Sequence, residues 1–134
     1  MTSQATTREI QAVLADATRS FKYKFLSANP SLSDEVVAEA NSLVLELLAV
    51  RDELDFFLFE PDALLTETAE VAGKLAGVAG KLASLIDSHR DQIVGYESGT
   101  FQCKSDCDLC LSRAESPLEA ALCHALFTRC IAKG

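Results

Sequence analysis

The chain of 134 residues contains no tryptophan, one methionine, three prolines and only two histidines. His89 and His124 fall on different predicted helices, so no Ser-His-Asp arrangement can be assembled around either of them. Cys123 precedes His124, but successive helical residues point about 100° apart, which does not make a pair of nucleophile and base. Glu-x-x-His pairs of the di-iron type and a glycine-rich phosphate loop are also missing. These absences favour a protein that is not an enzyme.

Positive charge is also scarce, because 12 Lys and Arg residues stand against 20 Asp and Glu residues and leave a net charge of -8. The basic residues are scattered along the chain, which disfavours the phosphate-binding surface that a nucleic-acid partner needs. No apolar run reaches the roughly 18 residues of a membrane-spanning helix, since the best candidate, residues 43–50, is interrupted by Glu46. We expect neither a nucleic-acid partner nor a transmembrane segment.

Residues 1–7 lack the basic start and the apolar stretch of a secretory signal peptide. The protein is therefore expected in the cytoplasm or, if a signal is removed before this numbering begins, in an oxidising compartment such as the intermembrane space or the periplasm. Five cysteines are many for a cytosolic domain of this size, and all of them lie after residue 100. The compartment decides whether these thiols stay reduced or form disulfides.

Apolar residues recur at helical spacing through most of the chain, while alternation with a period of two is almost absent. Helices are expected from Thr6 to Asn29-Pro30, from Ser31 or Ser33 to Glu60-Pro61, and over residues 62–94. The breaker-rich segment 95–100 predicts a linker. We therefore predict an all-α fold, a four- to five-helix bundle in a single domain. Its parts are a three-helix body over residues 1–94 and a cysteine-linked C-terminal helical hairpin over residues 101–134.

Residues 71–77 and 78–84 form a seven-residue repeat, Val-Ala-Gly-Lys-Leu-Ala-Gly followed by Val-Ala-Gly-Lys-Leu-Ala-Ser. Its apolar columns predict a coiled-coil-like seam, which can close within the chain or against a second copy. Gly73, Gly77 and Gly80 each weaken helix propensity by about 1 kcal/mol. We expect a neighbouring helix to approach closely over these glycines. The alternative is a groove that holds an apolar ligand.

Four of the five cysteines form a symmetric set, because six residues separate Cys103 from Cys110 and also Cys123 from Cys130. The midpoint falls in the segment 116–119, Ser-Pro-Leu-Glu, which is typical of a helix start. Seven positions span about two helical turns, so each pair lies on one face of its helix. An antiparallel hairpin folded at this midpoint would bring Cys110 opposite Cys123 and Cys103 opposite Cys130, in disulfide-bonding positions.

The fifth cysteine, Cys107, would be the free thiol, but it lies on nearly the same face and could replace Cys103 or Cys110 in the pairing. In outline, residues 103–130 resemble the twin-cysteine helical hairpins of mitochondrial intermembrane-space proteins. The resemblance implies a disulfide-bonded hairpin in an oxidising compartment. Six residues separate the paired cysteines here, a shorter spacing than is usual in that family.

The same cysteines also allow a metal site. Cys103, Cys107 and Cys110 stand at positions i, i+4 and i+7 of one helical face, and Cys123 or His124 could complete a tetrahedral zinc site. Thiolates on one face also suit copper(I). The Cys-x3-Cys-x2-Cys spacing resembles the cluster loop of radical-SAM enzymes, but the chain is too short for their barrel.

From these patterns we predict a non-enzymatic helical interaction or scaffold protein with a disulfide-stapled hairpin and no cofactor. Its partner is expected to be another protein or, through helix packing, a second copy of the chain. The first alternative is a zinc- or copper-binding or thiol-redox protein that uses the C-terminal cysteines. The second is an apolar-ligand carrier that uses the glycine-lined groove.

Overall fold

The computed structural model describes residues 3–59, 65–89, 91, 93 and 96–133. Within these residues the long helices are α1 (Ser3–Ser20), α3 (Asp34–Glu53), α5 (Leu65–Ser88), α6 (Tyr96–Arg113) and α7 (Pro117–Lys133). The short elements between them are the π-helix η1 (Phe21–Phe25), α2 (Leu26–Ala28) and α4 (Asp55–Phe59). No strand occurs in this part of the chain, so the predicted all-α bundle is confirmed.

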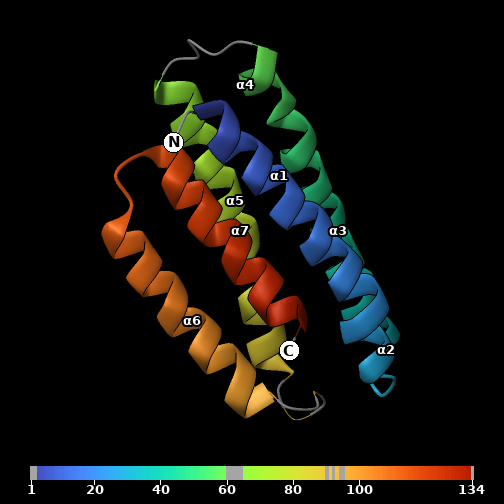
Figure 1. Cartoon of the computed structure of the whole chain (residues 1–134). Coiled ribbons are helices and arrows are strands. Elements are labelled where there is room, and N and C mark those ends of the chain that lie inside the picture. Colours follow the sequence, from blue (N-terminus) through green and yellow to red (C-terminus); the bar gives the residue numbers. More distant parts are fainter. Residues whose placement is uncertain (1–2, 60–64, 90, 92, 94–95, 134) are drawn as a thin grey trace.

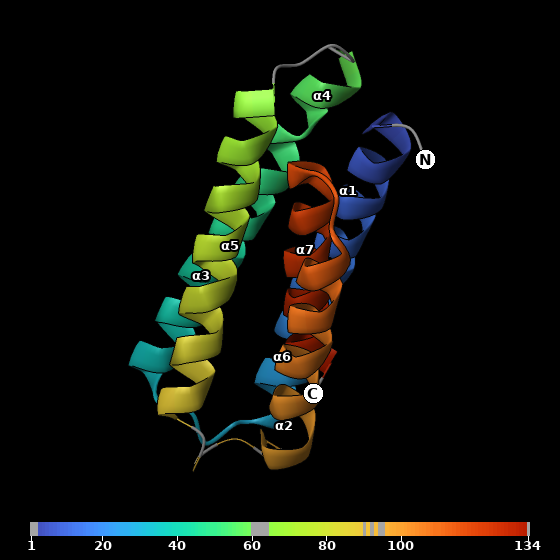
Figure 2. The same ribbon diagram turned by 90° about the vertical axis from the view of Figure 1, so that its left-hand side faces the viewer.

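Four of the long helices, α1, α3, α5 and α7, pack side by side around a common core (Figure 1). α7 lies against both α1 and α5, and α3 closes the ring by packing on the same two helices. The expected body of residues 1–94 therefore receives its fourth helix from the C-terminal hairpin. α6 lies outside the ring, and among the described residues α7 is the only element with which it has extensive contact (Figure 2).

The core of the bundle is apolar along its whole length, and every helix of the ring contributes to it. The large side chains that are almost fully buried include Ile10, Leu14, Phe21, Leu47, Leu54, Leu75 and Leu82. Leu75 and Leu82 occupy the same position in the two seven-residue repeats of α5 and form one of its apolar columns, so their burial in the core shows that the predicted seam closes within the chain. None of the described helices is long and apolar enough to span a lipid bilayer.

Two predicted helix boundaries are confirmed. Ser33 caps α3, where its Oγ accepts a hydrogen bond from the backbone N of Val36 at 3.3 Å. The first helical stretch ends at Asn29, as the following Pro30 predicts. There the Nδ2 of Asn29 donates a hydrogen bond to the carbonyl oxygen of Phe25 at 2.8 Å.

The first helix differs from the prediction in two ways. It begins at Ser3, so Thr6 and Thr7 are buried within α1 and neither caps it. The π turns of η1 then interrupt the α-helical pattern, which apolar periodicity alone did not predict. Phe21 and Phe25, at the two ends of η1, are both buried and stack with ring centroids 4.6 Å apart. The stack and the core around it hold this wider turn in place.

The connection between α5 and α6 lies earlier in the chain than predicted. α5 ends at Ser88, whereas the sequence places the end near Val94, which is outside the described residues. α6 begins at Tyr96, so residues 96–100 of the predicted linker are helical, and Gly95 is also outside the described residues. Helix propensity over a few residues is a weak predictor of where a helix starts or ends, because tertiary contacts elsewhere in the helix can override it.

Candidate functional site

The turn between α6 and α7 is formed by the local hydrogen bonds that the sequence predicts. Ser116 Oγ accepts a hydrogen bond from the backbone N of Glu119 at 3.2 Å, and Pro117 is the first residue of α7. Glu119 Oε2 accepts a second one from the backbone N of Glu115 at 2.6 Å. The Ser116 cap confirms the predicted helix start, and α7 runs back antiparallel to α6 (Figure 1).

Both predicted disulfides are present. Cys103 is bonded to Cys130 and Cys110 to Cys123, and in each pair the Cα atoms lie 5.7 Å apart. Because the bonded positions are about two turns apart along each helix, α6 is fixed to α7 at two levels. Cys107, which lies between them on α6, is the free thiol.

The Cys107 thiol is half-buried against α7, with its Sγ 3.9 Å from the carbonyl oxygen of Cys123. Burial raises the pKa of this thiol above its ordinary value, and the neighbouring carboxylate of Asp108 raises it further. The reactive thiolate is therefore a small fraction of Cys107 at neutral pH. In this environment the free thiol is expected to react more slowly with alkylating reagents than an unperturbed cysteine.

Three of the predicted metal ligands, Cys103, Cys110 and Cys123, are in disulfides, and a disulfide sulfur does not offer the thiolate that zinc or copper(I) binds. Cys107 and His124 remain, and burial lowers the pKa of His124, which keeps its imidazole neutral at pH 7. Over the residues that the structure describes, no group of three or more His, Cys, Asp or Glu side chains could hold a metal ion. A metal site in this hairpin therefore requires the reduced chain.

In the part of the chain that the structure describes, two grooves lie beside the hairpin. The first, of about 460 Å³, is called here the cysteine groove. It lies along the contact of α6 with α7 and is lined by Cys103, Asp106, Cys107, Cys110, Cys123, Leu126, Phe127, Arg129 and Cys130. The structure thus brings all five thiol positions to one surface, which the helical spacing of the cysteines predicts.

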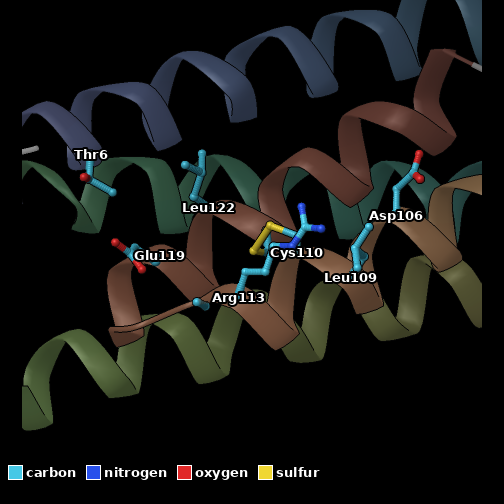
Figure 3. Close-up of a pocket in the computed structure, with 9 residues that line it drawn as sticks. Thr6, Asp106, Leu109, Cys110, Arg113, Glu119 and Leu122 are labelled. Atoms are coloured by element: carbon cyan, nitrogen blue, oxygen red, sulfur yellow. A yellow bond between two sulfur atoms is a disulfide. The ribbon is translucent and has the colours of Figure 1, made fainter.

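The second groove, of about 450 Å³, is called here the hairpin-end groove. It lies where α1, α6 and α7 meet and is lined by Thr6, Asp106, Leu109, Cys110, Arg113, Ala114, Glu119, Leu122 and Cys123. Figure 3 shows Leu109 and Arg113 extending from α6 beside the Cys110–Cys123 bond, with Leu122 and Glu119 coming from α7. The wall of the groove is mainly apolar, and the charged side chains of Asp106, Arg113 and Glu119 lie at its edge.

Leu109 is the most unusual residue of this groove, because 51% of it is exposed on a face of α6 that otherwise carries polar residues. It is not among the site residues predicted from the sequence. Its neighbours Asp108 and Ser112 are exposed polar residues. A leucine on the polar face of a helix is the signal that could have indicated it, because such a residue contributes little to the core.

The glycines of α5 do not support a close helix approach. Gly73, Gly77 and Gly80 are exposed, and a Cβ atom added at any of them would meet no atom within 4 Å. The predicted close packing over them is therefore wrong, because the heptad columns beside these glycines bury the other face of α5. Of the three, Gly77 lines a groove whose remaining residues include the charged groups Glu46, Glu53, Lys74 and Lys81. Such a lining does not favour the apolar ligand considered from the sequence.

The two histidines lie apart in the fold. His89 follows the end of α5 and donates its backbone N–H to the carbonyl oxygen of Ile86 at 3.2 Å. His124 lies midway along α7 and is half-buried. Among the described residues, no hydrogen bond joins either imidazole to a serine, threonine or cysteine side chain.

No known family model, curated protein or solved structure matches the chain.

Proposed function

We propose that the protein is a non-enzymatic helical interaction protein and that its binding surface is the hairpin-end groove with Leu109 at its edge. The observation that carries the proposal is the exposure of Leu109, 51%, next to an apolar wall that two disulfide-bonded helices hold in place. A few residues that become desolvated in well-packed pockets supply most of the binding energy of an interface.

The disulfide within this groove gives the surface a fixed shape. Cys110 and Cys123 both line it, so the bond between them sets the separation of α6 from α7 at the groove itself. A surface that is already ordered loses less conformational entropy when a partner binds. The disulfide-bonded hairpin therefore offers a partner a surface that is already rigid.

The charged groups around the groove indicate which partner fits. Asp106 and Glu119 are acidic and Arg113 is basic, so the edge has both signs of charge around an apolar centre. Interfaces between proteins commonly have this arrangement of an apolar centre and a polar rim. The partner is therefore a protein segment that inserts an apolar side chain beside Leu109.

The test compares Leu109 with Leu45, which is 65% exposed on α3 away from the hairpin. A photoreactive residue is placed at position 109 or at position 45 in cells, and the protein crosslinked only from position 109 is purified. Its affinity is then measured for the wild type, Leu109→Glu and Leu45→Glu. We expect Leu109→Glu to weaken binding by at least about tenfold and Leu45→Glu by less than about twofold.

The histidines provide the control for a non-enzymatic role. A double variant, His89→Ala with His124→Ala, should bind the partner with unchanged affinity, because neither side chain lines the hairpin-end groove. Equal effects of the two leucine variants would contradict the proposed surface. If the histidine variant binds the partner normally but no longer supports the function of the protein in cells, the proposed absence of catalysis is contradicted.

A thiol-redox or metal-binding role is the second candidate, and the observation that favours it is the gathering of all five cysteines in the cysteine groove. Intact-mass spectra of the purified protein, with and without reductant and alkylation, count the free thiols. One alkylatable thiol supports the stapled form. Five free thiols with zinc or copper mass in the native spectrum would support a metal protein.

A further inference from the structure

Over residues 102–113, α6 is attached to the rest of the molecule with very little apolar burial. From Gln102 to Arg113, Cys103 is the only buried side chain. α7 over a similar length buries Leu118, Ala121, Cys123, Ala125, Phe127, Thr128, Ile131 and Ala132. At about 25 cal/mol per Å² of buried apolar surface, a helix such as α6 gains little from docking. Its one buried residue is itself part of a disulfide.

Polar contacts do not replace the missing apolar burial. Between Gln102 and Arg113, the side-chain hydrogen bonds of Gln102 to Asp106 and of Ser112 to the Leu109 carbonyl stay within α6. The single one that reaches α7 is the weak contact of Cys107 Sγ with the Cys123 carbonyl oxygen at 3.9 Å. No ion pair joins these residues to another helix. The two disulfides therefore carry most of the attachment.

The helix nevertheless covers a defined part of α7. Leu126 and Phe127 of α7 line the cysteine groove together with Cys103 and Cys107 of α6, so they lie beneath α6. The other faces of α7 pack on α1 and α5 and do not depend on α6. Removal of α6 would therefore expose Leu126 and Phe127 of α7, and of residues 102–113 the core would lose only Cys103 and the partly buried Cys107 that packs against it.

We infer that α6 is a redox-released strap. Reduction of both disulfides detaches α6 from α7, while α1, α3, α5 and α7 stay packed. The reductant is a thiol such as glutathione or a protein dithiol. For each disulfide, one thiolate attacks a sulfur and forms a mixed disulfide, and a second thiolate then releases the cysteine. Each disulfide takes up two electrons and two protons, and for each one the reductant leaves as its own disulfide.

The inference concerns the attachment of α6, and only its biological use rests on the proposed function. If the hairpin-end groove is the binding surface, the strap also makes that surface sensitive to redox state, because Leu109 and Arg113 leave with α6. The affinity for the partner would then fall on reduction.

Hydrogen exchange of the full chain, measured by mass spectrometry before and after reduction, tests the strap. Alkylation confirms that both disulfides are open. We expect amides of residues 102–113 to exchange at least about tenfold faster after reduction, and amides of α1, α3, α5 and α7 to keep most of their protection. Unchanged protection of residues 102–113 would overturn the inference. A similar loss of protection in all helices would overturn it as well, because α6 would then not be separable.

Variants give a second measurement that does not need a reductant. One double variant, Cys103→Ser with Cys130→Ser, and another, Cys110→Ser with Cys123→Ser, should each keep α6 protected through the remaining bond. The quadruple variant should release it. Cys107→Ser is the matched control and should leave α6 protected, since Cys107 forms no disulfide. If the quadruple variant fails to fold, titration of the wild type with reductant decides between the same two outcomes.

The binding measurement tests the proposed surface and the hydrogen-exchange measurement tests the strap, so each hypothesis can be rejected without the other. If reduction releases α6 but Leu109→Glu does not alter affinity for the crosslinked protein, the strap stands and the proposed surface is wrong. If Leu109→Glu weakens binding but residues 102–113 stay protected after reduction, the surface stands and the strap is wrong.

Discussion

The helices of the four-helix ring and α6 are held in the fold by different forces, although α6 has about the same length as α1 and α7. α7 packs on α1 and α5 through small and apolar residues, so tertiary burial holds it. α6 exposes most of its side chains from Gln102 to Arg113 and is held by two covalent bonds. A helix need not be amphipathic to be part of a fold if disulfides fix it, but its position then depends on the redox state.

The largest expected effect comes from the core of the ring. Leu75→Ala removes a side chain that is fully buried on α5 and leaves a cavity, which should lower the free energy of unfolding by about 3 kcal/mol. Leu109→Ala on α6 should lower it by less than about 0.5 kcal/mol. Denaturant unfolding of the oxidised protein measures both. Similar losses for the two variants would contradict the contrast between the ring and α6.

The cap between the two regions should have an intermediate effect. Ser116→Ala removes the acceptor of the Glu119 backbone N–H at the start of α7, and we expect a loss of about 1 kcal/mol in the free energy of unfolding. Ser116→Asp is the matched control, because its carboxylate can accept the same hydrogen bond and should retain most of the stability. A loss as large in Ser116→Asp would show that the cap is not the cause.

The glycines of α5 should give a smaller effect of the opposite sign. Gly77→Ala places a methyl group in open space on an exposed helix face, and it should raise the free energy of unfolding by about 0.5 to 1 kcal/mol. Gly73→Ala, one turn away in the same surroundings, should do the same. Thermal unfolding followed by circular dichroism measures the change. Destabilisation by either variant would indicate that another helix or chain covers this face.

The smallest effect concerns the reactivity of Cys107. Because burial and then Asp108 raise the pKa of Cys107, its alkylation at pH 8 should be slower than that of a free cysteine peptide and should accelerate as the pH rises. Asp108→Asn removes one negative charge and should increase the rate by about twofold at pH 8. The larger cause, burial, remains in that variant, so the rate should stay below that of the peptide. A rate equal to that of the peptide in the wild type would contradict the half-buried position.

Much of the hairpin could be predicted from the sequence because its geometry is local. The spacing of Cys103 from Cys110 and of Cys123 from Cys130, together with the cap at Ser116, predicts which residues face each other after one turn. The heptad columns of α5 and the cap at Ser33 were predicted for the same reason. Each of these features depends on the periodicity of one helix or on hydrogen bonds within a few residues.

The features that were missed depend on which helices are neighbours. The exposure of Gly77 follows from the absence of a helix over that face of α5, and periodicity within α5 does not show which of its faces is covered. Leu109 was missed because the sequence Leu109-Cys110-Leu111 does not show which of these side chains faces the core and which lies at the edge of a groove. The start of α6 at Tyr96 was missed because Ser98 and Gly99 are weak helix formers, and the tether at Cys103 outweighs them.

The helical class and the capped turn at Ser116 follow from the amino-acid sequence, which also favours the observed pairing of four cysteines while leaving Cys107 as an alternative partner, because helical periodicity and local hydrogen bonds are properties of short segments. Only the tertiary structure decided that α7 completes the ring and that α6 stays outside. That choice depends on the apolar surface that helices distant in sequence can bury together. α7 offers such a surface on two sides, and α6 from Gln102 to Arg113 offers almost none.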